Sequence, residues 1–204
     1  MNPLSDLHTD ALTEIFNIGA GRAASSLSEI VGDEIKLSVP SIQFCQSSEV
    51  TAAALLIDNL HLGTVRQKFN GLFESTAMLL FAEERALEIV RDMMKSELSI
   101  EDLAEFEQEA MCELGNIVLN ACLSAMADIL NITLDSSLPT YSVDSSEAIV
   151  YQIICEEDQP FVLLLHINLE IEKHRSQGYL IFLLSYSSLT ELISRIDGFI
   201  SGIQ

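Results

Sequence analysis

Residues 10–40 read DALTEIFNIGAGRAASSLSEIVGDEIKLSVP, and residues 109–139 read EAMCELGNIVLNACLSAMADILNITLDSSLP. The two stretches share one pattern, in which a glutamate precedes an asparagine by three residues and a proline follows the asparagine by 23 residues. Two copies in one register indicate an internal duplication, which decides how the rest of the chain is interpreted. The shared residues are Glu14, Asn17 and Pro40 in the first copy and Glu113, Asn116 and Pro139 in the second.

Each copy begins with apolar residues that recur at spacings of three and four, which predicts an amphipathic helix. The apolar stripes are Leu12, Ile15, Phe16, Gly19, Ala23, Leu27 and Ile30 in the first copy and Met111, Leu114, Val118, Cys122, Ala125 and Ile129 in the second. The opposite stripes are Asp10, Glu14, Asn17 and Gly21, and Glu109, Glu113, Asn116 and Asn120. Helix C-caps are expected at Gly32 and Asn131.

The remainder of each half follows a common plan as well. Short helices are expected over residues 49–60 and 147–156, although 148–155 could equally form a strand. Two strands joined by a turn follow in each half, and an amphipathic helix then closes it. The predicted ranges are strands 62–69 and 72–81 around Asn70-Gly71, strands 161–170 and 179–184 around Ser176-Gln177-Gly178, closing helices 83–95 and 188–200, and a polar join over 95–101.

The repeat predicts one domain of the α+β class. Neither half offers enough helix and sheet surface to bury a core alone, so we expect a single domain over residues 1–204 with a pseudo-two-fold internal repeat. Its halves should cover about residues 5–98 and 101–204. An antiparallel sheet should pack with the two long motif-bearing helices, and two independent domains are the weaker alternative.

Composition limits the classes of partner. Acidic residues outnumber basic ones by 31 to 10, which gives a formal net charge of -21. That charge repels nucleic acid and anionic membrane surfaces and attracts a partner that presents lysines. The longest apolar runs fall short of the ~20 residues that a membrane helix needs, and the N-terminus lacks a secretory signal pattern. We therefore expect a soluble, cytoplasmic protein without nucleic-acid binding or membrane insertion.

The cysteines give no sign of a metal site or of a disulfide framework. They show no C-x-x-C spacing, and the four histidines are scattered along the chain. Cysteines set in apolar stretches are typical small hydrophobic residues of a reduced, cytosolic protein. The residues concerned are Cys45, Cys112, Cys122 and Cys155.

The repeated glutamate and asparagine are the candidate functional residues. At helical spacing three they lie on one face, about 5 to 6 Å apart between Cβ atoms. A single pair of this kind is typical of a solvated helix surface, but its repetition favours a function. An asparagine amide can donate to one partner and accept from another, so it can hold a water. No nucleophile with an adjacent base and no carboxylate cluster stands out. Such a site suits phosphoryl hydrolysis, in which the substrate brings the phosphate and the metal.

The spacing D/S-x3-E-x2-N-x22-P resembles the signature of the CheC, CheX and FliY phosphatase family of bacterial chemotaxis. The first copy matches it from Asp10 to Pro40 and also carries the run Asn17-Ile18-Gly19-Ala20-Gly21, which is similar to the family's N-I-G-A-G. The second copy keeps the glutamate, the asparagine and the proline. The resemblance covers essentially the whole chain, and the arrangement with two motifs is most similar to CheC.

The resemblance implies an enzyme that hydrolyses the aspartyl phosphate of a CheY-like response regulator without a covalent intermediate. Asn17 and Asn116 would then orient the attacking water, and Glu14 and Glu113 would pair with a lysine of the regulator. Asp10 and Glu109 would contribute to docking. The chain itself would bind no cofactor or metal, because Mg²⁺ sits on the phosphorylated partner. The resemblance also implies CheD as a further partner and a monomeric chain.

Several residues near the first motif have simpler expected roles. The helical pattern places Phe16 in the core, although the second copy and the family carry glycine there. Arg22 is expected to neutralise Asp10 at the surface. Asp6 is the expected N-cap of the first helix.

A different class of function fits the same residues. A catalytically silent adaptor could recognise a response regulator or a CheD-like deamidase through the same acidic faces. A regulated hybrid, weakly active until a partner binds, is a third possibility. The decay of phosphorylated regulator, with and without the purified protein, separates these classes.

Overall fold

The computed structural model describes residues 4–51, 61–94, 100–156, 158–171 and 174–202. Its elements, in chain order, are α1 (Asp6–Val31), β1 (Ile35–Gln46), the 3-10 turn η1 (Ser47–Glu49), β2 (His61–Gly71), β3 (Ser75–Ala82), α2 (Glu83–Met94), α3 (Ile100–Leu130), β4 (Leu134–Ser136), β5 (Thr140–Ser145), α4 (Ser146–Ile154), β6 (Phe161–Ile171), β7 (His174–Leu184) and α5 (Tyr186–Ile200).

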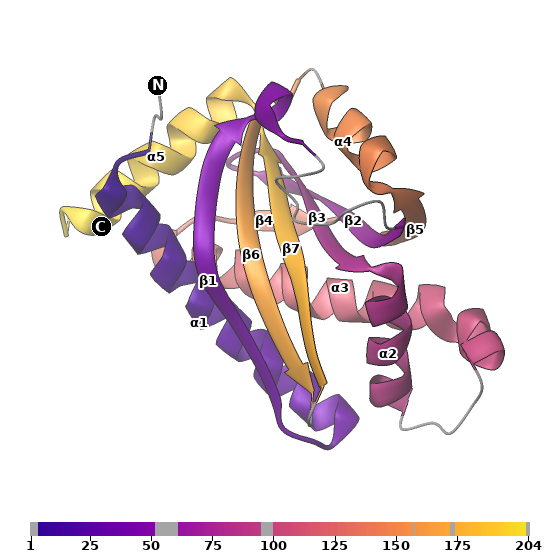
Figure 1. Cartoon of the computed structure of the whole chain (residues 1–204). Coiled ribbons are helices and arrows are strands. Elements are labelled where there is room, and N and C mark those ends of the chain that lie inside the picture. Colours follow the sequence, from indigo (N-terminus) through magenta and orange to yellow (C-terminus); the bar gives the residue numbers. More distant parts are fainter. Residues whose placement is uncertain (1–3, 52–60, 95–99, 157, 172–173, 203–204) are drawn as a thin grey trace.

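The strands form one seven-stranded antiparallel sheet in the order β1-β6-β7-β3-β2-β4, with β5 also paired to β2 (Figure 1). This order is the same from either edge when each strand is replaced by its counterpart in the other half. The strands that follow the motif helix of each half pair with the hairpin of the other half, β1 with β6, and β4 and β5 with β2. The structure therefore confirms the α+β class, the antiparallel sheet and the pseudo-two-fold repeat.

Both faces of the sheet are covered. Helices α1 and α3 pack on each other and, with α2 and α5, cover one face, whereas α4 covers the other. Alternate residues of one strand therefore enter different cores: Leu163 and Leu165 face α1 and α3, and Val162 and Leu164 face α4. This explains why the central strands read as continuous apolar runs rather than as alternating ones.

The two motif helices approach each other and the sheet closely. A Cβ on Gly19 would lie 2.5 Å from the Cα of Cys122, so a glycine permits the contact between α1 and α3. A Cβ on Gly115 would lie 2.3 Å from a methyl group of Val65 on β2. Phe16, the counterpart of Gly115, is buried and stacks on Phe182, with ring centroids 5.2 Å apart. The expectation that Phe16 is a core ring is confirmed.

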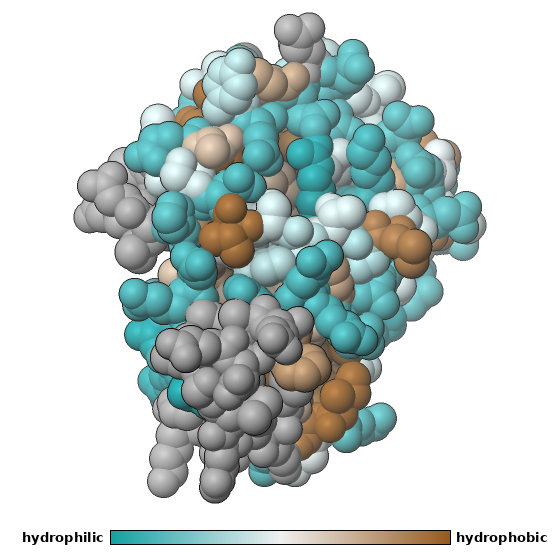
Figure 2. Space-filling view, turned by 90° about the vertical axis from the view of Figure 1, so that its right-hand side faces the viewer, coloured by the Kyte–Doolittle hydropathy of each residue, from teal (hydrophilic) through white to brown (hydrophobic). Residues whose placement is uncertain are grey.

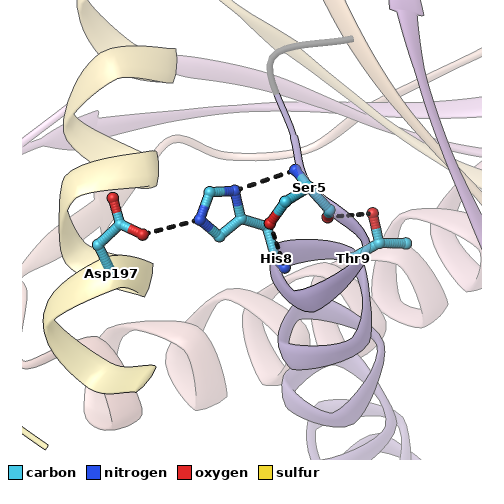
Figure 3. Close-up of polar contacts among 4 residues, drawn as sticks. All are labelled: Ser5, His8, Thr9 and Asp197. Atoms are coloured by element: carbon cyan, nitrogen blue, oxygen red, sulfur yellow. Dashed lines mark hydrogen bonds and ion pairs between the residues drawn. The ribbon is translucent and has the colours of Figure 1, made fainter. Parts of the chain in front are cut away.

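The first helix is anchored at its start by Ser5 and His8. Ser5, not Asp6, is the N-cap, and its hydroxyl accepts from the His8 backbone N–H while His8 Nδ1 accepts from the Ser5 N–H. His8 Nε2 lies 2.8 Å from a carboxylate oxygen of Asp197, which joins α1 to α5 (Figure 3). The C-caps are as predicted, since Gly32 (φ 72°) and Asn131 (φ 51°) are left-handed.

Some strand and helix boundaries differ from the sequence-based prediction. Residues 176–178 lie inside β7 rather than in a turn, because the pairing of β6 with β7 continues to Ile171 and His174. Of the helix expected over 49–60, only Glu49 lies in the turn η1, residues 50–51 are not helical, and residues 52–60 lie outside the described residues. Residues 146–154 do form a helix, which decides between the helix and the strand considered for this segment.

Three side chains are placed differently from expectation. Ile30 is exposed, because Leu27 and Val31 fill the inward positions of the last turn of α1. Cys155 is exposed at the end of α4, so it is not a core residue. Arg22 pairs with Asp128 of α3 at 2.6 Å rather than with Asp10.

One helical stretch, Phe106–Leu130, is long and apolar enough to cross a membrane by length and composition alone. Half of its most apolar window is buried inside the structure, where α3 packs on α1 and on β2. A core helix of a soluble protein passes the same test.

Candidate functional site

The two predicted pairs lie on the two long helices, Glu14 and Asn17 on α1 and Glu113 and Asn116 on α3. Both glutamates are exposed, as are the docking candidates Asp10 and Glu109. Both asparagines are half-buried, so the polar stripe of each helix is only partly solvated at these positions. What each amide contacts differs between the two copies.

In the first copy the Asn17 amide is bonded to the main chain of β1. Its Nδ2 donates to the carbonyl oxygens of Val39 (3.0 Å) and Thr13 (2.9 Å), and its Oδ1 accepts from the Val39 N–H (3.0 Å). Both N–H groups of the amide are therefore occupied, and one acceptor site on the oxygen is left.

An interruption in β1 explains why the Asn17 side chain bonds the main chain there. The pairing of β1 with β6 shifts between Ser38 and Ser41, which leaves Val39 and Pro40 outside the ladder. Pro40 has no N–H to satisfy, whereas Val39 is 1% exposed and its main-chain groups need partners. The Asn17 side chain supplies both partners. In this copy, the spacing of 23 residues from asparagine to proline places the interruption of β1 beside the Asn17 side chain.

In the second copy the corresponding segment is an open loop between β4 and β5. Leu138, the counterpart of Val39, is 88% exposed. The Asn116 oxygen accepts from Asn120 Nδ2 at 2.8 Å and lies 3.4 Å from Gln67 Nε2. Among the described residues, no partner is bonded to the Asn116 Nδ2. Both N–H groups of the Asn116 amide are thus available to a ligand, unlike those of Asn17.

A pocket of about 610 Å³ lies at this second site. Glu109, Glu113 and Asn116 line it together with Pro139, so the structure brings the predicted residues of the second motif to one place. The other lining residues come from α2, α3 and the β4–β5 loop: Met93, Phe106, Ala110, Cys112 and Leu138. Figure 2 shows the side of the molecule that carries α2, the start of α3 and β5, a hydrophilic surface with separate hydrophobic patches.

A side-chain hydrogen bond joins β5 to α3, and a thiol lies in the pocket. The Tyr141 hydroxyl on β5 donates to a carboxylate oxygen of Glu107 on α3. Burial, followed by this hydrogen bond and the Glu107 charge, raises the pKa of Tyr141. Burial also raises the pKa of the Cys112 thiol in the pocket, so it stays protonated at neutral pH and is a poor nucleophile.

The arrangement can hold and orient small molecules but offers few reactive groups. Among the residues that the structure describes, no three His, Cys, Asp or Glu side chains could together hold a metal ion. The second site presents amide donors and two exposed carboxylates beside an apolar wall. Such a site can position a water and pair with a cation that a partner brings.

Sequence reasoning missed two polar residues of the second site, Gln67 and Asn120. Asn120 stands on the predicted polar stripe, so its place on the helix was visible. Gln67 was not, because it lies 49 residues before Asn116, on a strand. The signal that could have found it is a glutamine at an inward position of β2, where the second half has Ile167.

Comparisons with known proteins agree with the fold and the motif. Residues 7–43 match the CheC-like family. The chain is 26% identical over 166 residues to the CheY-P phosphatase CheC of Bacillus subtilis (strain 168), which covers 78% of this chain and 77% of that protein.

The fold is similar to solved chemotaxis and flagellar proteins. Thermotoga maritima FliY superposes with a TM-score of 0.78 at 21% identity, covering 99% of this chain and 100% of that chain. The FliM middle domain of H. pylori superposes with a TM-score of 0.59 at 14% identity, covering 94% and 99%. The matched motif, the sequence relative and the fold together make the chain similar to CheC-like proteins.

Proposed function

We propose that the chain is a phosphatase that hydrolyses the aspartyl phosphate of a CheY-like response regulator by orienting a water, without a covalent intermediate. The observation that carries this proposal is the pocket on α3, in which Glu113 and Asn116 lie beside Pro139. The similarity to a protein named CheY-P phosphatase CheC supports the substrate class.

The chemistry follows from what each side chain can offer. The Asn116 Nδ2 donates to the oxygen of a water and holds its remaining lone pair toward the phosphorus. The exposed Glu113 carboxylate pairs with a lysine of the regulator and fixes the docking, while Glu109 extends the acidic contact. Mg²⁺ arrives with the phosphorylated partner, whose phosphoryl group it neutralises.

The first motif offers the same glutamate but a more restricted amide. Asp10 and Glu14 are exposed and can dock a regulator in the same way. Asn17 has only one acceptor site left, because Thr13 and Val39 occupy its donors. We therefore assign most of the turnover to the site on α3 and a smaller share to the site on α1.

The decay of phosphorylated regulator tests the proposal. The purified chain should shorten the half-life of a phosphorylated CheY-like regulator, and Asn17→Ala combined with Asn116→Ala should abolish this effect. Removal of one preorganised donor costs on the order of 10² to 10³ in rate, or about 3 to 4 kcal/mol. Asn70→Ala, an exposed change on β2, is the matched control. A double variant that clears the regulator at the parental rate would refute the mechanism.

A second candidate is an adaptor that binds without turnover. Phe106 and Leu138 expose apolar side chains at the pocket, which suits a protein partner. The likeness to the FliM middle domain shows that this fold also occurs in a flagellar protein. An adaptor would bind the phosphorylated regulator and leave its half-life unchanged.

Three further features belong to the proposal. CheD as a further partner and a monomeric chain come from the resemblance, and a cytoplasmic location comes from the composition of the sequence. Adding a CheD-like protein to the decay assay tests for a regulated enzyme, because a change in rate on addition would reveal the coupling.

A further inference from the structure

In the two copies of the motif, different side chains bond the main-chain groups of the interrupted strand. On β6, His166 pairs with Ser41 and Asn168 with Ser38, so Ile167 faces the interruption at residues 39–40. On β2, Arg66 pairs with Thr140 and Phe69 with Ser136, so Gln67 faces the corresponding interruption at 137–139. The second copy therefore has a buried amide where the first copy has an apolar side chain.

Gln67 contacts the main chain of the interrupted segment, as Asn17 does in the first copy, but at Ser137 rather than at the counterpart of Val39. Its Nε2 donates to the Ser137 carbonyl oxygen at 2.7 Å, in the interrupted segment. Because this bond serves the segment, Asn116 does not have to do so. Gln67 is 1% exposed, so it is held firmly in the core beside Asn116.

The orientation of the Asn116 amide follows from two main-chain carbonyls. The Ser137 carbonyl can only accept, so it fixes the Gln67 Nε2 toward it, and the Asn116 carbonyl fixes the Asn120 Nδ2 in the same way at 2.8 Å. Both donors also point to the Asn116 side-chain oxygen. A reversed Asn116 amide would place donors against donors. Its oxygen is therefore inside, and its N–H groups are left for a ligand.

The first copy lacks both of these donors. Ile167 stands in place of Gln67, and Gly21 stands in place of Asn120. Asn17 accordingly turns its own donors to Thr13 and Val39.

We propose that Gln67 and Asn120 are positioning residues that hold the Asn116 carbonyl oxygen and so present its N–H groups to the water in the α3 pocket. Gln67 also bonds the Ser137 carbonyl of the interrupted segment, so that segment does not bind the Asn116 amide as its counterpart binds Asn17. The inference deepens the proposed phosphatase function and rests on it for its effect on rate. Neither residue is among those that line the pocket.

Two variants test the inference. Gln67→Met keeps the length of the side chain and removes its polar atoms, and Asn120→Ala removes the second donor on a helix that tolerates alanine. Each should lower kcat on the order of 10- to 100-fold, as expected for misplacement of a reacting water, while KM for the phosphorylated regulator stays near the parental value. Gln43→Met, the same exchange at an exposed position of β1, is the matched control and should leave both constants unchanged.

A second readout does not depend on turnover. The side-chain N–H₂ resonances of Asn116, assigned by their loss in Asn116→Ala, should shift and broaden in Gln67→Met and Asn120→Ala but not in Gln43→Met. Unaltered resonances together with parental kcat would overturn the inference, as would a raised KM at unchanged kcat. If the wild-type chain shows no phosphatase activity, the proposed function fails, and the resonances still decide the role of Gln67.

Discussion

At the scale of single residues, the two asparagines of the repeat make different hydrogen bonds. Asn17 satisfies the buried main chain of Val39, whereas Asn116 has its oxygen held and its donors free of described partners. The sequence could place both on the same helical stripe, because periodicity reports which face a residue occupies. It could not show their hydrogen bonds, which depend on whether the segment 23 residues later is a strand bulge or an open loop.

Asn17→Ala should therefore reduce stability more than it reduces activity. The variant leaves the N–H and C=O of Val39 buried without partners, and each unsatisfied group costs about 1 to 3 kcal/mol of stability. Urea unfolding should show a lower free energy of unfolding for Asn17→Ala and a smaller change for Asn116→Ala. The decay of phosphorylated regulator should show the reverse order. Equal losses of stability in the two variants would contradict the proposal that Asn17 stabilises the fold through the main chain of Val39.

The thiol of Cys122 gives a prediction about pH. Complete burial raises its pKa from 9.0 to about 12, so the folded chain keeps this thiol protonated over a range in which the unfolded chain ionises it. Its contribution to stability is present below pH 9.0 and is lost as pH rises toward 12. Urea unfolding at stepped pH should give a shallower fall in this window for Cys122→Ala than for the parent. Between pH 7 and 8, where the thiol stays protonated in both the folded and the unfolded chain, the difference between the two proteins should not vary with pH; a difference that varies there would contradict the assignment.

At the scale of elements, the helices were more predictable than the hairpin of the second half. The motif helices, their C-caps and the closing helices follow from periodicity and from Gly32 and Asn131. The turn expected at 176–178 was wrong: Ser176-Gln177-Gly178 are residues typical of turns, but here they continue the pairing of β7 with β6, with Ser176 and Gly178 buried and Gln177 exposed. A glycine in this stretch, Gly178, instead permits a close approach, since a Cβ there would lie 2.4 Å from the Leu80 carbonyl oxygen.

Two glycines on α1 give a matched test of the packing of α1 on α3. In Gly19→Ala the new methyl group would meet the Cα of Cys122 at 2.5 Å, a backbone atom that cannot move alone, so the helices must separate at a cost of about 1 to 3 kcal/mol. In Gly21→Ala nothing lies within 4 Å, and alanine favours a helix by about 1 kcal/mol. Thermal unfolding should show a lower Tm for the first variant and an equal or higher Tm for the second. A Tm that rises in both would show that the two helices can part freely.

At the scale of the whole molecule, the repeat explains why the two halves share one sheet. Strand β1 pairs only with β6, and β5 pairs only with β2, among the described strands, so each half completes the sheet of the other. The central contact is between β3 and β7, one strand from each half. The sequence predicted the duplication and the class, but not this exchange of strands, because similarity between the halves does not reveal which half a strand joins.

The exchange of strands predicts that neither half folds alone. Residues 1–98 and 100–204 expressed separately should each lack an edge partner for a hairpin and leave an apolar face of α1 or α3 open to water. Mixed together, the two fragments should recover the circular dichroism and the elution volume of the intact chain, because every pairing that crosses the join can form between separate chains. The intact chain is the control in both measurements. A fragment that is monomeric and unfolds cooperatively by itself would show that the halves are independent domains. It would contradict the expectation of a single domain over residues 1–204.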